Sequence, residues 1–179
     1  MLKIYFTELE NAKTHSEEFA RCVLGKNLNV DGESILIYRN EFGKPFLKDH
    51  PYIHFNISHT KGAIVCAVSD EPVGVDIERV KRFNKCIVER FFTQNEQNYI
   101  FASNENVAER FIEIWTKKEA YVKWVGKGMQ EIPFASFDVL QMSIPKLRVI
   151  KKREYLISVC TYIPDSNVHQ IQMKEICWE

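Results

Sequence analysis

Short apolar or alternating segments, separated by turn residues, dominate the first eighty residues of the chain. They predict strands at 2–7, 34–38, 53–58, 63–69 and 73–78. One helix is expected among them, over 16–24, and Gly25 is expected to stop it. In the segment 53–58 the apolar side chains should point inward, while His54, Asn56 and Ser58 point outward.

From about residue 84 to residue 125 the apolar positions recur at helical spacing instead. One apolar stripe is formed by Phe111, Ile114, Trp115, Val122 and Val125. Strands are expected to resume at 136–141, 155–162 and 168–176. Strands and helices followed by helices and strands predict an α+β chain built as two halves that meet near residue 85. The apolar segments 63–69 and 157–162, each with a cysteine, occupy comparable places in these halves.

Two segments bring together side chains that suit phosphoryl chemistry. On the strand 73–78, Asp76 and Glu78 lie on the same face as Gly74, about 7 Å apart by strand rise. On the later helix, Glu119 lies at the edge of the apolar stripe and Lys123 follows one turn on. Such a strand and helix would together hold a hard cation and keep a base beside it. Taken singly, the carboxylates are typical of a solvated strand face, and Glu119 with Lys123 of a surface pair.

Further motifs precede and separate these two segments. The chain carries Gly-Lys-Pro-Phe at 43–46, Ile-His-Phe-Asn-Ile-Ser-His-Thr at 53–60, Arg-Phe-Phe-Thr at 90–93 and Gly-Lys-Gly at 126–128. In this order and spacing the chain resembles the 4'-phosphopantetheinyl transferases, specifically the surfactin-synthetase-activating type, in which two similar halves lie in one chain. The resemblance covers about residues 41 to 140. It implies two α+β halves, 1–85 and 86–179, related by a pseudo-twofold, with the active site in the cleft between them.

The resemblance also implies an activity. It implies transfer of phosphopantetheine from coenzyme A to a serine of an apo-carrier protein, with release of 3',5'-ADP and dependence on Mg²⁺. The matching positions Asp76, Glu78 and Glu119 are then the metal ligands. Glu119 is expected to act as a ligand, as the general base, or as the residue that orients a metal-bound water. Lys123 is expected to pair with phosphate oxygens or to keep Glu119 charged.

Coenzyme A contacts are also implied residue by residue. Lys44 and Pro45 match the nucleotide-side loop of the family, and Ser58 and His59 match the Ser-His pair that lies against the coenzyme, with His59 donating to the 3'-phosphate. Without the motif, Lys44 would be an ordinary surface lysine and His59 a turn residue bonded to backbone.

Several positions leave the resemblance incomplete. Lys127 is either a lysine that complements the end of the helix dipole or a further phosphate contact. Glu96 matches a family glutamate, with a solvated acid at a helix start as the alternative. The arginine-rich N-terminal stretch of longer relatives is missing, since residues 8–30 offer only Lys13, His15, Arg21 and Lys26.

Composition excludes several classes of protein. The 24 basic and 24 acidic residues cancel, so no global field attracts nucleic acid or an anionic membrane. No segment approaches the roughly 20 apolar residues that span a bilayer. The five cysteines are dispersed and without a Cys-x-x-Cys pair, which indicates reduced, mostly buried thiols. We therefore expect a cytoplasmic monomer that binds neither nucleic acid nor membrane.

Two other functions compete with carrier modification. A metal-dependent nuclease or phosphatase uses similar carboxylates, but the neutral chain lacks the basic stripe of a nucleic-acid enzyme. A non-catalytic module that docks carrier proteins would tolerate loss of the carboxylates, yet Asp76, Glu78, Glu119 and Lys123 are all present. No Walker or Rossmann glycine motif supports nucleotide hydrolysis or hydride transfer.

The segment between Phe83 and Phe101 is rich in large apolar side chains, more than one helix face normally buries. Some of them are expected at the surface as a patch that receives the carrier protein in the helix-in-groove mode. The alternative is that all of them form the core between the two halves.

Overall fold

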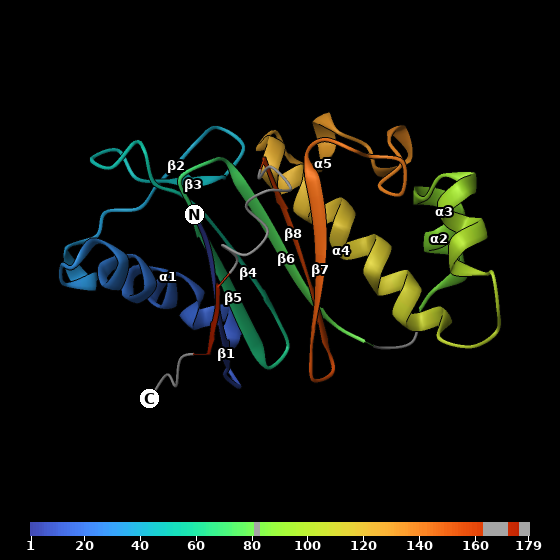
Figure 1. The fold of residues 1–179 in the computed structure, drawn as a ribbon, viewed down its shortest axis with the longest axis horizontal. Helices are drawn as coiled ribbons and strands as arrows, with labels where there is room; N and C mark the ends of the chain where they lie inside the picture. The colour runs from blue at the N-terminus through green and yellow to red at the C-terminus, as the bar shows by residue number, and fades with distance from the viewer. Residues whose placement is uncertain (81–82, 163–171, 176–179) are drawn as a thin grey trace.

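The computed structural model describes residues 1–80, 83–162 and 172–175. Two sheets pack face to face, and each is covered on its outer face by a helix, as Figure 1 shows with α1 on one side and α4 on the other. The first sheet has the strand order β4-β5-β1-β9, and the second has the order β6-β8-β7. The predicted α+β class is confirmed.

The first sheet is formed mainly by the first seventy residues. Its strands are β1 (Leu2–Glu8), β4 (His54–Thr60), β5 (Ala63–Ser69) and, paired in parallel with β1, β9 (Gln172–Glu175). Helix α1 (Ala12–Leu28) covers its outer face. A 3₁₀ turn, η1 (Gly32–Ser34), and a small pair of strands, β2 (Tyr38–Arg39) and β3 (Pro45–Phe46), connect α1 to β4.

The second sheet begins at residue 73. Its strands are β6 (Val73–Arg79), β7 (Lys146–Lys152) and β8 (Tyr155–Thr161). The helices between them are α2 (Lys85–Phe91), α3 (Gln94–Ile100), α4 (Val107–Val125) and α5 (Gly128–Glu131), followed by the 3₁₀ turn η2 (Phe134–Ser136). The long helix α4 packs directly on β6 and β8, while α2 and α3 lie farther out (Figure 1).

The two sheets repeat one order of elements. In the first, β1 is followed by α1 and then by the hairpin β4–β5, with β5 pairing antiparallel to β1. In the second, β6 is followed by α4 and then by the hairpin β7–β8, with β8 pairing antiparallel to β6. The apolar strands β5 and β8 thus occupy equivalent central places, as their sequences indicated. Division of the chain near residue 85 stays a prediction.

Alternation along β6 explains its place in the core. Val73, Val75 and Ile77 are fully buried between the two sheets, together with alternate residues of β1, β5 and β8. The opposite face of β6, with Gly74 and Asp76, turns toward α4. The period of two that predicted this division is therefore confirmed, although the second face is covered rather than solvated.

Helix α1 is longer than predicted, and Gly25 does not end it. The helix runs to Leu28 and ends at Asn29, which has a left-handed backbone. A Cβ on Gly25 would lie 2.8 Å from the backbone nitrogen of Gly32 and from the carbonyl oxygen of Val30. Gly25 is therefore needed for the close approach of the segment that follows the helix, rather than as a stop signal.

Two predicted strands are wrong or shorter than expected. The segment 34–38 is mostly irregular and contributes only the start of β2. The segment 136–141 forms turns, while the strand β7 that follows it was not predicted. The predicted strand 168–176 contains β9, and its remaining residues lie outside the described part of the chain.

Candidate active site

Asp76 lies where β4, β6 and α4 meet. Its side chain is buried, and Oδ1 accepts hydrogen bonds from Lys123 Nζ at 2.7 Å and from Ser58 Oγ at 2.8 Å. Lys123 Nζ also donates to Ser58 Oγ at 2.9 Å. The other carboxylate oxygen, Oδ2, is buried and has no hydrogen-bond partner within the described residues. A buried anionic oxygen without a partner is costly, so this atom is prepared for a ligand.

Gly74 brings α4 against β6 at the level of Asp76. A Cβ at this position would lie 2.1 Å from the carbonyl oxygen of Ala120 and 2.4 Å from the nitrogen of Trp124. Helix and strand therefore touch through their backbones. This contact sets Lys123 and Glu119, which lie on the same side of α4, next to the carboxylates of β6.

Glu119 is half-buried and lies among like charges. Burial, followed by the negative charges of Asp76 and Glu78, raises its pKa from the ordinary 4.5 to about 7, while Lys123 opposes the shift. The structure thus brings together Asp76, Glu119 and Lys123, as predicted from their spacing. The hydrogen bonds of Lys123 go to Asp76 and Ser58, although its charge also acts on Glu119.

The polar face of β4 is not outward, contrary to expectation. Asn56 and Ser58 are only 3% and 7% exposed, because this face meets β6 at the boundary between the sheets. Asn56 Oδ1 accepts a hydrogen bond from the backbone nitrogen of Val75 at 2.9 Å, and Thr60 Oγ1 donates to Glu78 Oε2 at 3.0 Å. Sequence analysis did not assign Asn56 or Thr60 a role. Their period-two spacing from Ser58 was the available signal.

A cleft of about 280 Å³ opens beside these groups. Lys44, Pro45 and Asn56 line one wall, and Glu119 and Lys123 line another. Lys44 Nζ donates to the carbonyl oxygen of Trp124 at 2.7 Å, and burial lowers its pKa to about 8. It therefore caps the C-terminal end of α4, and its contact with phosphate stays a prediction. The exposed Lys127 follows the left-handed Gly126 that ends α4, and its role stays open.

His59 faces a second hollow, of about 320 Å³, at the start of α1. Lys13, Thr60 and Lys61 also line it. Asn11, at the N-cap of α1, makes no side-chain hydrogen bond to the helix, and the first turn holds no acidic residue. Burial and the charges of Lys123 and Lys13 lower the pKa of His59. Lys13, Lys61 and an uncapped helix start thus lie around this hollow, together with one acidic residue, Glu10.

Glu96 is neither solvated nor close to the cleft lining. It is fully buried with Lys118, whose Nζ lies 2.9 Å from Glu96 Oε2 and donates to the carbonyl oxygens of Phe134 and Phe137. Glu96 Oε1 accepts from the backbone nitrogen of Val139 at 2.9 Å. Burial lowers the pKa of Lys118, and Glu96 opposes this shift. The alternative of a solvated acid is therefore wrong, and Lys118, which sequence analysis did not single out, is its partner.

The donor set at β6 fits a hard cation in part. Among the described residues no group of three Asp, Glu, His or Cys side chains lies close enough to hold a metal ion as it stands. However, the partnerless Asp76 Oδ2 and the mutual repulsion of Asp76, Glu78 and Glu119 are both relieved by a cation with oxygen ligands. The predicted ligands are therefore suitable in chemistry.

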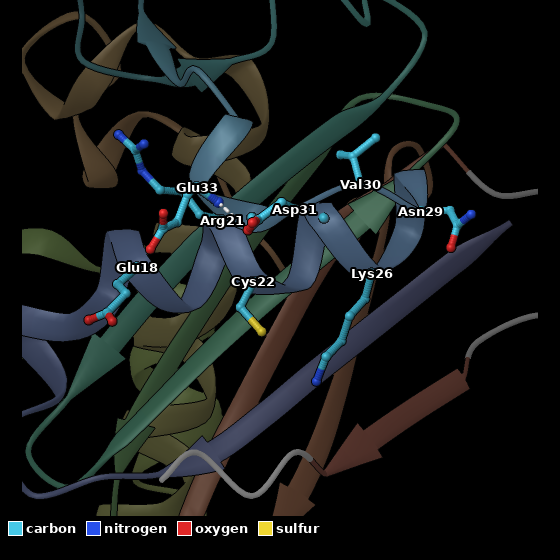
Figure 2. Close-up of a pocket in the computed structure, with 10 residues that line it drawn as sticks. Glu18, Arg21, Cys22, Lys26, Asn29, Val30, Asp31 and Glu33 are labelled. Carbon is cyan, nitrogen blue, oxygen red and sulfur yellow. Dashed lines mark hydrogen bonds between the residues drawn. The ribbon is translucent and has the colours of Figure 1, made fainter.

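Another hollow, of about 650 Å³, lies against the outer side of α1. Figure 2 shows Glu18, Cys22 and Lys26 projecting from successive turns of the helix without converging on one point. Arg21 there donates to the carbonyl oxygen of Ile35 and pairs with Glu17. Because its charged side chains do not converge, this hollow is a weaker candidate for an active site than the cleft beside Glu119.

Two further properties concern the helices and the cysteines. None of the described helices combines the length and the apolar character needed to cross a membrane. The described cysteines, Cys22, Cys66, Cys86 and Cys160, are all free thiols. Two of these are buried, Cys86 is exposed, and Cys177 lies outside the described residues.

Comparisons with known proteins identify the family of the chain. The family model for the 4'-phosphopantetheinyl transferase superfamily matches residues 72–171. The chain is 47% identical to 4'-phosphopantetheinyl transferase gsp of Aneurinibacillus migulanus over 62% of this chain and 46% of that protein. It is 32% identical to 4'-phosphopantetheinyl transferase Sfp of Bacillus subtilis over 76% of this chain and 61% of that protein. The chain thus spans about half the length of these curated relatives.

A third relative is covered more fully. The chain is 30% identical to 4'-phosphopantetheinyl transferase ffp of Bacillus subtilis over 91% of this chain and 79% of that protein. Among solved structures, holo-[acyl-carrier-protein] synthase of Thermotoga maritima aligns at 17% identity with a TM-score of 0.42, over 50% of this chain and 61% of that one. From the family match and the relatives in sequence, the chain belongs to the 4'-phosphopantetheinyl transferase superfamily.

Proposed function

We propose that this chain transfers the 4'-phosphopantetheine group of coenzyme A to a serine of an apo-carrier protein and releases 3',5'-ADP. The observation that carries the proposal is the meeting of Asp76, Glu119 and Lys123 beside a cleft, with one carboxylate oxygen of Asp76 buried and without a partner. Family membership favours this reaction over a metal-dependent nuclease or phosphatase.

Binding of coenzyme A is assigned to the two hollows on either side of β4. The pyrophosphate would lie in the cleft beside Lys123, within reach of Ser58 and Lys44. The 3'-phosphate would lie at the start of α1, where His59, Lys13 and Lys61 face one hollow. Backbone N–H groups of an uncapped helix start favour a phosphate, which would also stabilise protonated His59. This arrangement would replace the arginine-rich stretch of longer relatives.

The cation would be Mg²⁺, held by Asp76, Glu78 and Glu119 with phosphate oxygens and water completing its shell. Bound there, it would neutralise charge on the pyrophosphate. The carrier serine hydroxyl attacks the phosphorus that carries pantetheine, and the bond from that phosphorus to the oxygen bridging the two phosphates breaks, so 3',5'-ADP leaves. Glu119 would serve in one of three ways: as a ligand of this cation, as the base that receives the serine proton, or as the residue that orients a metal-bound water for that task.

The direct test is mass spectrometry of apo-carrier proteins incubated with coenzyme A, Mg²⁺ and the chain. We expect a gain of one phosphopantetheine on the carrier serine and complete loss of this gain when divalent ions are chelated. Restoring Mg²⁺ after chelation is the control for damage to the protein. A carrier that binds without gaining mass would identify a docking module instead. Transfer that survives complete removal of divalent ions would contradict the assignment of a metal to Asp76.

The carrier would dock on the part of the segment 83–101 that remains exposed. Val88, Phe92 and Ile100 are buried in the core around α4, whereas Phe91 and Phe101 are 37% and 39% exposed. Most of the segment is therefore core, as in the alternative reading of the sequence, and the proposed docking surface consists of Phe91 and Phe101.

Replacing Phe91 and Phe101 with serine tests this surface. We expect the KM for the carrier to rise several-fold while the KM for coenzyme A stays unchanged, because neither side chain lines the cleft. Tyr52→Ser is the matched control, since Tyr52 is 86% exposed and lies before β4. An equal rise in both KM values would mean that the core was damaged and that the docking proposal is wrong.

We further propose that the chain acts as a monomer in the cytoplasm. The free thiols of the described cysteines support a reducing compartment. The balance of 24 basic and 24 acidic residues supports the absence of nucleic-acid binding.

A further inference from the structure

Strands β4 and β6 meet at the boundary between the two sheets but do not pair as neighbouring strands. Each lies at the edge of its own sheet, β4 beside β5 and β6 beside β8. Within the described part of the chain, the backbone of β6 therefore has no strand partner on the side that faces β4. Side chains of β4 contact β6 instead, one at its backbone and two at its carboxylates.

Three side chains on one face of β4 each reach a different group of β6. Asn56 Oδ1 accepts a hydrogen bond from the backbone nitrogen of Val75 and so ties β4 to the backbone of β6. Ser58 Oγ donates to Asp76 Oδ1, and Thr60 Oγ1 donates to Glu78 Oε2. The spacing is regular, since both hydroxyls lie 18 residues before the carboxylate that they contact. One β4 hydroxyl thus holds one oxygen of each carboxylate.

We infer that the polar face of β4 positions the two carboxylates of β6 for a divalent cation, and that Thr60 is the positioning residue for Glu78. A hydroxyl that donates to one carboxylate oxygen restricts the rotation of the group and directs its second oxygen. For Asp76 the second oxygen is the buried, partnerless Oδ2. Thr60 is half-buried, so its hydrogen bond is partly shielded from competing water. This inference rests on the proposed function, because the cation is the one assigned there.

Thr60→Val tests the inference, because valine keeps the shape and the β-branch of threonine and removes only the hydroxyl. We measure binding of Mn²⁺ to the full chain by its electron paramagnetic resonance signal, in the presence of coenzyme A. Loss of a group that orients a metal ligand typically weakens metal binding by about 10- to 100-fold, so at least a tenfold loss is expected. Thr60→Ser restores the hydroxyl and should bind Mn²⁺ within about twofold of the unmodified chain, well below that loss.

Two controls separate positioning from stability. Thr161→Val removes a strand hydroxyl that donates to the carbonyl oxygen of Pro72, far from both carboxylates along β6 and β8. It is expected to leave Mn²⁺ binding unchanged, whatever its effect on the melting temperature. The KM for coenzyme A of Thr60→Val should also stay unchanged, while its KM for Mg²⁺ rises.

The outcomes distinguish this inference from the proposed function. If the unmodified chain binds Mn²⁺, Asp76→Asn does not, and Thr60→Val binds as tightly as the unmodified chain, positioning by Thr60 is wrong while the metal site stands. If the unmodified chain with coenzyme A binds no Mn²⁺, the metal site and this inference fall together. Weakened binding in both Thr60→Val and Thr60→Ser would show that packing at residue 60, rather than the hydroxyl, matters, and would also overturn the inference.

Discussion

Asp76→Ala is expected to reduce phosphopantetheine transfer below detection. The substitution removes the carboxylate that accepts from Lys123 and Ser58, and with it the buried oxygen proposed to bind the cation. No neighbouring group replaces it, because Glu78 and Glu119 already belong to the same proposed ligand set. Transfer is measured by the mass of the carrier protein over a range of Mg²⁺ concentrations, and excess Mg²⁺ should not restore it.

The fold is expected to survive Asp76→Ala, although Asp76 does not lie on a solvated face of its strand. Asp76 is buried, so its face is a packing face. Its partner Lys123 keeps a side chain that is 27% exposed and can be solvated once the carboxylate is gone. Asp76→Asn preserves volume and should be equally inactive. Asp70→Asn is the matched control, since Asp70 is an exposed aspartate that pairs with the N-terminal amine. Turnover by Asp76→Asn near that of the unmodified chain would contradict the role of the carboxylate.

Glu119→Gln is expected to lower kcat by at least about 10²-fold, the usual cost of losing an acid–base or electrostatic group. Glutamine keeps the shape of the side chain and removes its charge. Glu109→Gln is the control on the same helix, because Glu109 pairs with Lys151 at the surface. Near-normal turnover by Glu119→Gln would show that Glu119 is only a helix surface residue.

Glu119→Gln is also expected to change how the stability of the metal-free chain depends on pH. The pKa of Glu119 rises from 4.5 to about 7 in the metal-free fold, so the folded state binds a proton that the unfolded state releases between these values. Its contribution to the free energy of unfolding is fully present below pH 4.5 and is lost as the pH rises to about 7. Melting of the metal-free chain across this range should show the loss, and Glu119→Gln should lack it. An identical pH dependence in both proteins would mean that the Glu119 carboxyl is not desolvated.

Local periodicity predicted the parts of the site that lie within one element. The alternation of Val73, Val75 and Ile77 with Asp76 located the functional face of β6, and the stripe of α4 placed Glu119 at its edge. These inferences needed only the geometry of a strand and a helix. That the polar face of β4 lies against β6 is a contact between sheets, and no local pattern in either segment specifies it. Asn56 and Thr60 were missed for this reason.

The wrong strand at 136–141 has a related cause. A strand was expected at 136–141, and the backbone groups of such a segment need partners. In the fold these partners are the buried side chains of Lys118 and Glu96, which bind the carbonyl oxygens of Phe134 and Phe137 and the nitrogen of Val139. A buried ion pair from α3 and α4 thus takes the place of a neighbouring strand. These contacts span 16, 19 and 43 residues of sequence, and pairing of this kind leaves no periodic signal.

The close backbone contact at Gly74 limits where the cleft beside Asp76 can widen. Since α4 and β6 touch without a side chain between them, no rotamer change loosens this contact, and the two elements must move as one body. The contact between β4 and β6 is different, because hydrogen bonds of side chains hold it. Any widening that admits a bulky nucleotide is therefore expected along β4 rather than between α4 and β6.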